Sequence, residues 1–407
     1  MTTTRPLRVA VAGAGQRATS FFRNVPADLA GRVELAAVAE PEQSRRSSFI
    51  RMFGDGGARE FGSSDELLDQ GALAALQLDG LVIGTPNDSH FRDICAAARA
   101  GLTVMAEKPV VTTVAQCQQL WSATNATPGR VLVGFVLRYV PFYSRIQRII
   151  EGGEIGEVLA IDCQESLSTG LTGVFQKGWR SSLARSGGLI VEKCCHDIDV
   201  FNWLVGKPAN RVFSMSNRQH FRPRPVEEQL GRFVRSRSTA AYDFGDTSEE
   251  NVFAPGSVSN PYECDSQIPD RQVVTVEYTG GVLCTLTVLM AQPETNRKIK
   301  IFGTNGTIEG DLKEGRLSVV TAEPGRNVWT MREEIMEAPN ASDHHGGDAI
   351  ISEAFWRGVA GEEELSRAGL REGIEAVLVA AAAEESALTG LPVDVATLRR
   401  LTFGSSV

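Results

Sequence analysis

The apolar positions of the first ~130 residues fall into short runs, separated by segments with helical periodicity. Short apolar runs are typical of buried parallel strands, and the segments between them are typical of crossover helices. The predicted strands are Leu7–Val11, Val33–Ala39, Gly80–Gly84, Thr103–Ala106 and Arg130–Phe135. The predicted helices are Gln16 to about Pro26, Gln43–Phe53, a short one from Asp65, and Ser89–Ala100. This order predicts a doubly wound parallel sheet of the Rossmann type over residues 1–130.

The pattern changes over residues 131–407, where strand signals follow one another with hairpin turns between them. The predicted strands are Val158–Glu165, Arg211–Ser216, Gln272–Tyr278, Val282–Leu289, Lys298–Phe302 and Thr307–Asp311. The predicted helices are Pro141–Glu151, Gly188–Val205, about Gly346–Val359 and about Ala368–Thr389. This half is therefore expected to be an α+β domain with an open, largely antiparallel sheet, in a chain of overall α/β class. Residues 220–270 are polar and weakly periodic, which predicts a long loop or insertion.

Composition narrows the class of protein. The formal charge of −9 argues against a nucleic-acid binder, which normally carries a basic face. The longest apolar run, about Ala376–Ala383, is far shorter than the ~18–20 residues of a membrane span, and no apolar signal core precedes Arg8. The seven cysteines are scattered without a CxxC pair, which favours a reducing compartment and a cytoplasmic location.

A GxGxxA pattern follows the first predicted strand and opens a helix, with Gly13 and Gly15 at the turn and Gln16 and Arg17 beyond it. Glycines there permit a tight turn and let a pyrophosphate approach the helix N-terminus. Glu40 ends the second strand, where a carboxylate can accept hydrogen bonds from the adenosine ribose and repel a 2′-phosphate. The pattern predicts NAD as the cofactor. A helix-capping role for the acid stays open, and the nearby Arg45 and Arg46 leave NADP as the less favoured alternative.

Two further segments end strands at the same predicted edge of the sheet. The first holds Thr85, Pro86 and Asn87, with His90 in the next helical turn, where its alternative role is capping or packing. The second is Glu107-Lys108-Pro109. Lysines are scarce, seven of 41 basic residues, so Lys108 after a buried strand is an unusual placement for surface filler. An ammonium there can contact the cofactor ribose and a substrate hydroxyl.

Together "GAGQRA", "TPNDSH", "EKP" and "RYVPFY" resemble the glucose-fructose oxidoreductase, inositol dehydrogenase and rhizopine catabolism (Gfo/Idh/MocA) family over essentially the whole chain. The resemblance implies that Lys108 lies at the active site beside the nicotinamide. It also implies a second domain whose open sheet supplies the substrate face and often an oligomer interface, so a homo-oligomer (dimer or tetramer) through the C-terminal sheet is expected.

The resemblance extends to "SGGLIVEKCCHDIDVFNWLVG", where relatives carry an acid four residues before a histidine in a helix. Glu192 and His196 match that spacing and would share one helical face. His196 is expected to take the hydroxyl proton, and Glu192 to orient it or reach the substrate. Relatives more often have aspartate at this position, which leaves the geometry of the pair open. Adjacent cysteines on a helix point about 100° apart and no second thiol pair follows, so no metal is expected.

Several other side chains are candidates for substrate contact, because aromatic rings stack on sugars and arginines bind hydroxyls or anions. They are Tyr139, Trp179, Arg180, Arg185, Lys193, His344 and His345. The last two stand in "DHHGGD", which is similar to segments of carbohydrate-acting branches of the family, with a surface loop as the alternative.

Three functions follow from these residues. The first is an NAD-dependent oxidoreductase that removes hydride from a secondary hydroxyl of a sugar, inositol or glycoside. The second is an NAD-dependent glycosidase, conceivably on an anionic sulfosugar glycoside, in which transient oxidation at C3 permits elimination, water addition and re-reduction. The third is a non-catalytic NAD(H)-binding sensor or scaffold. The two enzymatic functions depend on Lys108 and His196 meeting at one bound carbon, whereas the sensor does not.

Overall fold

The computed structural model describes residues 5–54, 56–124, 130–168, 172–223, 262, 265–322, 325, 328–336, 344–362 and 367–404. The described chain forms two compact units. Among the described residues, the first unit holds those up to 139 together with 346–374, and the second unit holds all the others. The chain thus stays in the first unit beyond residue 130 and later returns to it. The domain boundary predicted at residue 130 stays a prediction.

The first unit is built on a parallel sheet that has six strands among the described residues, in the order β3-β2-β1-β4-β5-β6. The strands are β1 Leu7–Ala12, β2 Val33–Ala39, β3 Arg59–Phe61, β4 Gly80–Ile83, β5 Thr103–Ala106 and β6 Arg130–Val133. Their central members are buried throughout, because helices cover both faces of such a sheet. This strand order is that of a Rossmann domain and confirms the predicted fold class.

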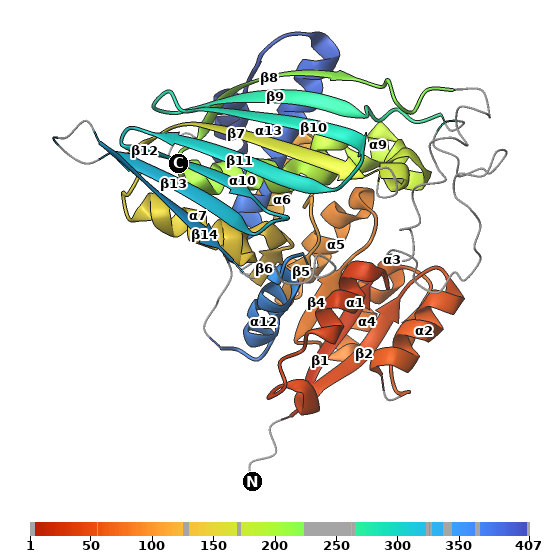
Figure 1. Cartoon of the computed structure of the whole chain (residues 1–407). Helices are drawn as coiled ribbons and strands as arrows, with labels where there is room; N and C mark the ends of the chain where they lie inside the picture. The colour runs from red at the N-terminus through yellow and green to blue at the C-terminus, as the bar shows by residue number, and fades with distance from the viewer. Residues whose placement is uncertain are drawn as a thin grey trace. The chain divides into compact units, whose positions relative to one another are not determined.

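Helices complete the first unit (Figure 1). They are α1 Gln16–Arg23, η1 Ala30–Arg32, α2 Gln43–Phe53, α3 Ser64–Leu67, α4 Gln70–Leu76, α5 Asn87–Arg99, α6 Val114–Thr124, η2 Val136–Tyr139 and α12 Gly347–Val359. Helix α12 packs on α1, where Trp356 Nε1 donates a hydrogen bond to the carbonyl of Phe21 at 3.0 Å. The rings of Phe21 and Phe355 also meet edge to face. A helix from the C-terminal part of the sequence therefore fills the N-terminal core.

The second unit is built on a mixed sheet that has nine strands among the described residues, ordered β14-β13-β12-β11-β7-β10-β9-β8-β15. The strands are β7 Val158–Ser168, β8 Ala209–Asn217, β9 Arg271–Tyr278, β10 Leu283–Gln292, β11 Asn296–Gly303, β12 Gly306–Asp311, β13 Arg316–Ala322, β14 Trp329–Ile335 and β15 Val393–Asp394. Among the described residues, every strand pairing in this sheet is antiparallel except that of β7 with β10. Buried and exposed positions alternate along β7 and β9, which leaves one face of the sheet open.

The helices of the second unit are α7 Pro141–Glu151, η3 Gly173–Gln176, η4 Gly178–Ser181, α9 Leu183–Ser186, η5 Ile190–Cys194, α10 Cys195–Val205, α13 Leu370–Thr389 and α14 Val395–Phe403. The first turns of α13 belong to the first unit. In Figure 1, α7, α10 and α13 lie on the same side of the large sheet. The helix predicted over Gly188–Val205 differs in kind, because its first turn, η5, is π-helical.

Several elements were not predicted from the pattern: β3, α6, β13, β14, β15 and α14. Strand β14 is exposed at nearly every position. Its apolar residues therefore do not form a buried face. Most of residues 220–270 lies outside the described residues, so the predicted loop or insertion is untested. Among the described residues, no helix is both long and apolar enough to cross a bilayer.

Candidate active site

The glycine turn between β1 and α1 is tightly built. Gly13 has φ +88°, and a Cβ on it would lie 2.6 Å from the carbonyl carbon of Gly84, so only glycine fits. Gly15 is the N-cap of α1, and a Cβ there would meet nothing within 4 Å. The first turn of α1 contains no acidic residue. The helix N-terminus therefore faces open space and favours an anion.

Glu40 stands beside this turn at the end of β2. Its Oε2 accepts a hydrogen bond from the Ala14 N–H, and its Oε1 accepts one from the Glu42 N–H, both at 3.1 Å. Arg45 pairs with Glu42 at 2.9 Å, and Arg46 pairs with Glu60 at 2.7 Å. The carboxylate is thus held at the mouth of the turn, while both neighbouring arginines are already balanced by acids.

These residues fit a dinucleotide. The open space above Gly15 suits a pyrophosphate, and Glu40 stands where an adenosine ribose would lie. Arg17, in the first turn of α1, also has a buried Nη2 atom with no hydrogen-bond partner among the described residues. A buried guanidinium nitrogen left without a partner is costly, and a phosphate oxygen would satisfy it.

The carboxyl ends of β4 and β5 are tied together by His90. Its Nδ1 lies 2.6 Å from the carbonyl oxygen of Pro109, and its Nε2 lies 2.8 Å from that of Thr85. Thr85 Oγ1 also donates to Asp93 at 2.8 Å. His90 is therefore a buried cross-link between two strand ends, and cofactor contact by His90 stays a prediction.

Glu107 and Lys108 follow β5 at the same edge. Glu107 is buried and accepts a hydrogen bond from Arg17 Nε at 2.7 Å, whereas Lys108 is partly exposed. Arg17 also donates through Nη1 to Asp348 at 2.6 Å. Burial alone would lower the pKa of Arg17, but the Glu107 and Asp348 carboxylates outweigh burial and raise it. Arg17 is therefore a fixed cation between two acids.

In the second unit, Glu192 is joined to two of the predicted substrate residues. Arg180 Nε donates to Glu192 Oε1 at 3.0 Å, and the guanidinium lies 4.3 Å from the centre of the Trp179 ring. Glu192 and His196 are both buried. Trp179, Arg180 and Glu192 thus form one connected group next to the helix that carries His196.

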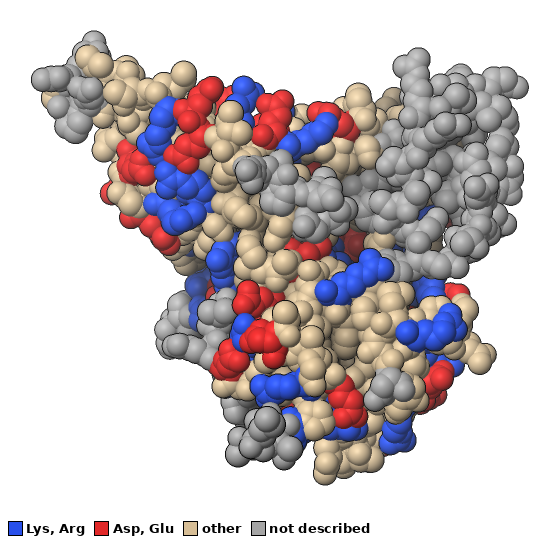
Figure 2. Space-filling view, turned by 60° about the horizontal axis from the view of Figure 1, so that its bottom comes forward, with Lys and Arg blue, Asp and Glu red and all other residues tan. Residues whose placement is uncertain are grey.

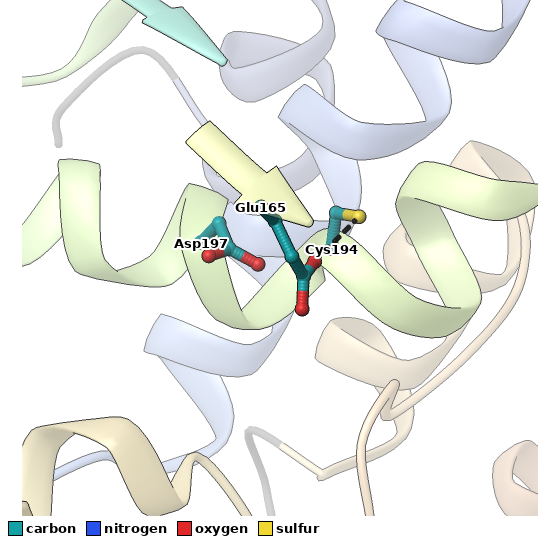
Figure 3. A group of neighbouring side chains, drawn as sticks. All are labelled: Glu165, Cys194 and Asp197. Carbon is teal, nitrogen blue, oxygen red and sulfur yellow. Dashed lines mark hydrogen bonds between the residues drawn. The ribbon is translucent and has the colours of Figure 1, made fainter. Parts of the chain in front are cut away.

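Lys193, Cys194 and Asp197 point into a buried charge cluster at the base of the same helix, shown in part in Figure 3. Lys193 Nζ lies 3.1 Å from Glu165 Oε1, and Cys194 Sγ donates to Glu165 Oε2 at 3.2 Å. Arg297 pairs with Glu165 and also with Asp197, the latter at 2.8 Å. These contacts anchor the helix to strands β7 and β11.

Glu165, Cys194 and Asp197 offer ligand atoms within 4.8 Å of one another, a spacing that a metal ion could use. Burial tends to raise the pKa of Glu165, but Arg297 and Lys193 together lower it, while burial raises the pKa of Asp197. Two cations already neutralise the two carboxylates. A divalent ion would have to displace Arg297, so the donor set suits an ion-pair network better than a metal.

The π-helical turn before His196 has a distant partner. The Ile190 N–H donates to Glu384 Oε1 at 2.6 Å, and a Cβ on Gly188 would lie 2.4 Å from Glu384 Cδ. Burial raises the pKa of Glu384 to about 7. π-helical turns frequently occur at functional sites. Because Glu192 lies inside this turn and His196 follows it in α10, the α-helical spacing argument for their shared face does not transfer directly.

Comparison with known proteins agrees with this geometry. Residues 7–135 match the model described as the oxidoreductase family, NAD-binding Rossmann fold. Residues 147–395 match the oxidoreductase family's C-terminal alpha/beta domain. The chain belongs to the Gfo/Idh/MocA oxidoreductase family. The resemblance noted in the motifs is thereby confirmed, as are the Rossmann domain and the largely antiparallel second sheet.

Individual relatives of this Gfo/Idh/MocA chain are distant. It is 27% identical to the proposed oxidoreductase YteT of Bacillus subtilis (strain 168), over 73% of this chain and 76% of YteT. It is 29% identical to an inositol 2-dehydrogenase of Leifsonia xyli subsp. xyli (strain CTCB07), over 52% and 57%. A levoglucosan dehydrogenase in complex with NADH and L-sorbose has a TM-score of 0.74 at 17% identity, covering 97% of this chain and 100% of that one. That last likeness shows the fold.

The remaining predicted substrate residues of this family member are spread over several different environments. Tyr139 is buried in the first unit's core, where its hydroxyl accepts a hydrogen bond from the Arg367 N–H at 2.8 Å. Lys193 is paired with Glu165, and Arg185 is exposed. His344 and His345 both have positive φ and precede α12. Substrate contact by each of these residues stays a prediction, as does the meeting of Lys108 with His196.

The sequence did not point to three acids that join distant segments: Asp348, Glu165 and Glu384. Asp348 closes the "DHHGGD" segment, whose histidines were the predicted substrate contacts. Glu384 directly follows the longest apolar run, and an acid at the end of such a run was the one available signal. Nothing local in the sequence pairs Glu165 with Arg297, because that contact forms only when β7 and β11 align.

Proposed function

We propose that this chain is an NAD-dependent dehydrogenase acting on a secondary hydroxyl of a sugar, inositol or related glycoside. The proposal rests on the residues that gather at one edge of the parallel sheet in the first unit. The open α1 N-terminus, the Glu40 carboxylate and Lys108 all follow the carboxyl ends of parallel strands in the first unit. Ligands of doubly wound sheets bind at that edge.

The reaction divides between the cofactor and the protein. When bound, NAD would supply the hydride acceptor, at C4 of its nicotinamide. The hydroxyl oxygen meanwhile loses its proton and becomes a carbonyl oxygen. In the proposal Lys108 contacts that oxygen, His196 takes the proton, and Glu192 orients His196 or the substrate. Trp179 supplies an aromatic face for the sugar, and Arg180 is held beside it by Glu192.

The proposal includes NAD rather than NADP. A 2′-phosphate at the adenosine ribose would meet the Glu40 carboxylate, which two backbone N–H groups hold in place. Arg45 and Arg46 could offset that repulsion only by leaving Glu42 and Glu60. The NADP alternative therefore requires a rearrangement of both arginines.

Turnover tests the proposal. Purified protein is incubated with NAD and a panel of inositols, hexoses and glycosides, and NADH absorbance is followed. The Lys108→Ala variant is expected to lower kcat by about 10²-fold, with the affinity for NADH little changed, as is typical for a lost acid/base group. Near-normal turnover of Lys108→Ala would remove Lys108 from the mechanism.

The same assay separates the alternatives. A glycosidase using transient C3 oxidation would release aglycone with only catalytic NAD and no net NADH. Its anionic-substrate version has weaker support, because Arg180 and Lys193 are already paired with acids. A sensor would bind NAD(H), turn over nothing and be indifferent to Lys108→Ala.

The proposed partners are a small carbohydrate and further copies of this chain. On the face seen in Figure 2, basic and acidic side chains are interspersed, with no extended basic surface for a nucleic acid. The open face of the large sheet exposes large apolar side chains on strands β8, β9, β10 and β14. Exposed apolar groups of this kind are typical of interfaces. The side chains are Met215, Val273, Leu283, Trp329, Met331 and Ile335.

Light scattering of the wild type and of Met331→Glu tests this homo-oligomer, since a charge in the interface should favour monomers. A monomeric wild type would contradict it. The proposed compartment is the cytosol, since the six described cysteines are all buried and outside disulfides.

A further inference from the structure

One arginine joins three distant segments of the first unit. Arg17 of α1 donates to Glu107 at the end of β5 and to Asp348 in the first turn of α12, at 2.7 and 2.6 Å. The side chains of the two acids are only 8% and 5% exposed. Buried charge-assisted bonds of this kind have defined geometry, in contrast to surface ion pairs. We call this group the Asp348–Arg17–Glu107 clamp.

The clamp acts on the residue next to Lys108. Glu107 Oε1 is held by Arg17, and Glu107 Oε2 accepts the Lys108 N–H at 3.3 Å. A Cβ on Gly134 would lie 2.9 Å from Glu107 Oε1, so Gly134 leaves just enough room for the carboxylate. Both oxygens and the surrounding space therefore fix Glu107, and with it the backbone that carries Lys108.

The opposite side of the same turn is held by His90, whose ring bridges the carbonyl oxygens of Thr85 and Pro109. The Glu107-Lys108-Pro109 turn is thus attached to α1 and α12 on one side and to α5 on the other. Arg17 also stands one residue past Gln16, in the turn that faces the dinucleotide site. A displacement of α12 would therefore reach both the turn and the cofactor helix.

We propose that Asp348 and Arg17 are positioning residues, which hold the Lys108 amine in register with the cofactor through Glu107. The "DHHGGD" segment then serves the reaction through its aspartate. The inference rests on the proposed role of Lys108. A displacement of about 1 Å at a catalytic group can cost on the order of 10²-fold in rate, so a buried clamp one residue away has a large effect.

Kinetics with matched variants test the clamp. Asp348→Ala removes the second acid, and Asp348→Asn keeps an acceptor oxygen without the charge. Asp28→Asn is the control, because Asp28 binds Arg357 of the same helix in an exposed pair at 2.7 Å. We expect kcat to fall at least tenfold in Asp348→Ala and less in Asp348→Asn. The KM for sugar should change less than threefold, and Asp28→Asn should match the wild type.

A second readout needs no turnover. The chain has seven lysines, so reductive methylation with ¹³C-formaldehyde labels few side chains, and Lys108→Arg assigns the Lys108 resonance. We expect the shift and pH titration of that resonance to change in Asp348→Ala and Asp348→Asn, with the other six unchanged. An unaltered Lys108 resonance in both variants would overturn the clamp. If it responds although no polyol is oxidised, the clamp stands and the proposed function fails.

Discussion

Burial of the Glu384 carboxyl predicts that the stability of the second unit depends on pH. Its side chain is buried among α13, β9 and the π-helical turn, where it accepts the Ile190 N–H at 2.6 Å. Burial raises the pKa of this carboxyl to about 7 from 4.5, although the Ile190 N–H and the Gln272 side chain partly oppose the rise. The charged form is therefore disfavoured in the native state.

The sign and size of the effect follow from that difference. Between pH 4.5 and 7 the native chain holds a proton that the unfolded chain has released, so stability falls as pH rises through this window. The difference of 7 − 4.5, about 2.5 pH units, corresponds to a loss of about 3 kcal/mol, complete above pH 7. Glu384→Gln stays neutral and keeps an acceptor oxygen for Ile190, so this loss should vanish.

Urea unfolding followed by circular dichroism, from pH 5 to pH 9, measures the effect. Hydrogen exchange of the Ile190 amide gives a local readout. We expect Glu384→Gln to match the wild type near pH 5 and to be more stable by up to about 3 kcal/mol at pH 8.5. Glu385→Gln, at the adjacent exposed position, is the control. Parallel stability curves for the wild type and Glu384→Gln would refute the reasoning.

Two further predictions concern the cofactor and the buried charge cluster. Glu40→Ala should weaken NAD binding far more than NADP binding in a fluorescence titration. The variant loses the ribose contact, but it also loses the repulsion of a 2′-phosphate. Equal weakening of both cofactors would contradict the ribose assignment. Arg297→Met should destabilise the second unit by about 3–5 kcal/mol in urea, because Glu165 and Asp197 would stay buried without their shared cation, and a loss below ~1 kcal/mol would show that water reaches the cluster.

Local patterns were sufficient for every described strand of the first sheet except β3, and for much of the second sheet. Strand Val33–Ala39 and helices Gln43–Phe53 and Pro141–Glu151 have the bounds expected from sequence, because their apolar spacing alone selects the element. The positions of Gly13, Glu40 and Lys108 could be predicted for the same reason, since each follows the end of a strand that the pattern marks. Their roles in binding and catalysis stay predictions.

Tertiary structure decided which of these residues touch. Arg17 and Asp348 lie 331 positions apart and meet only because α12 returns to the first unit. The π-helical turn at Ile190 has the buried Glu384 of α13 as its partner. The helical periodicity of the sequence does not predict this contact. Contacts between distant segments depend on packing and on the desolvation of charge, and these are properties of the folded chain rather than of any local stretch of sequence.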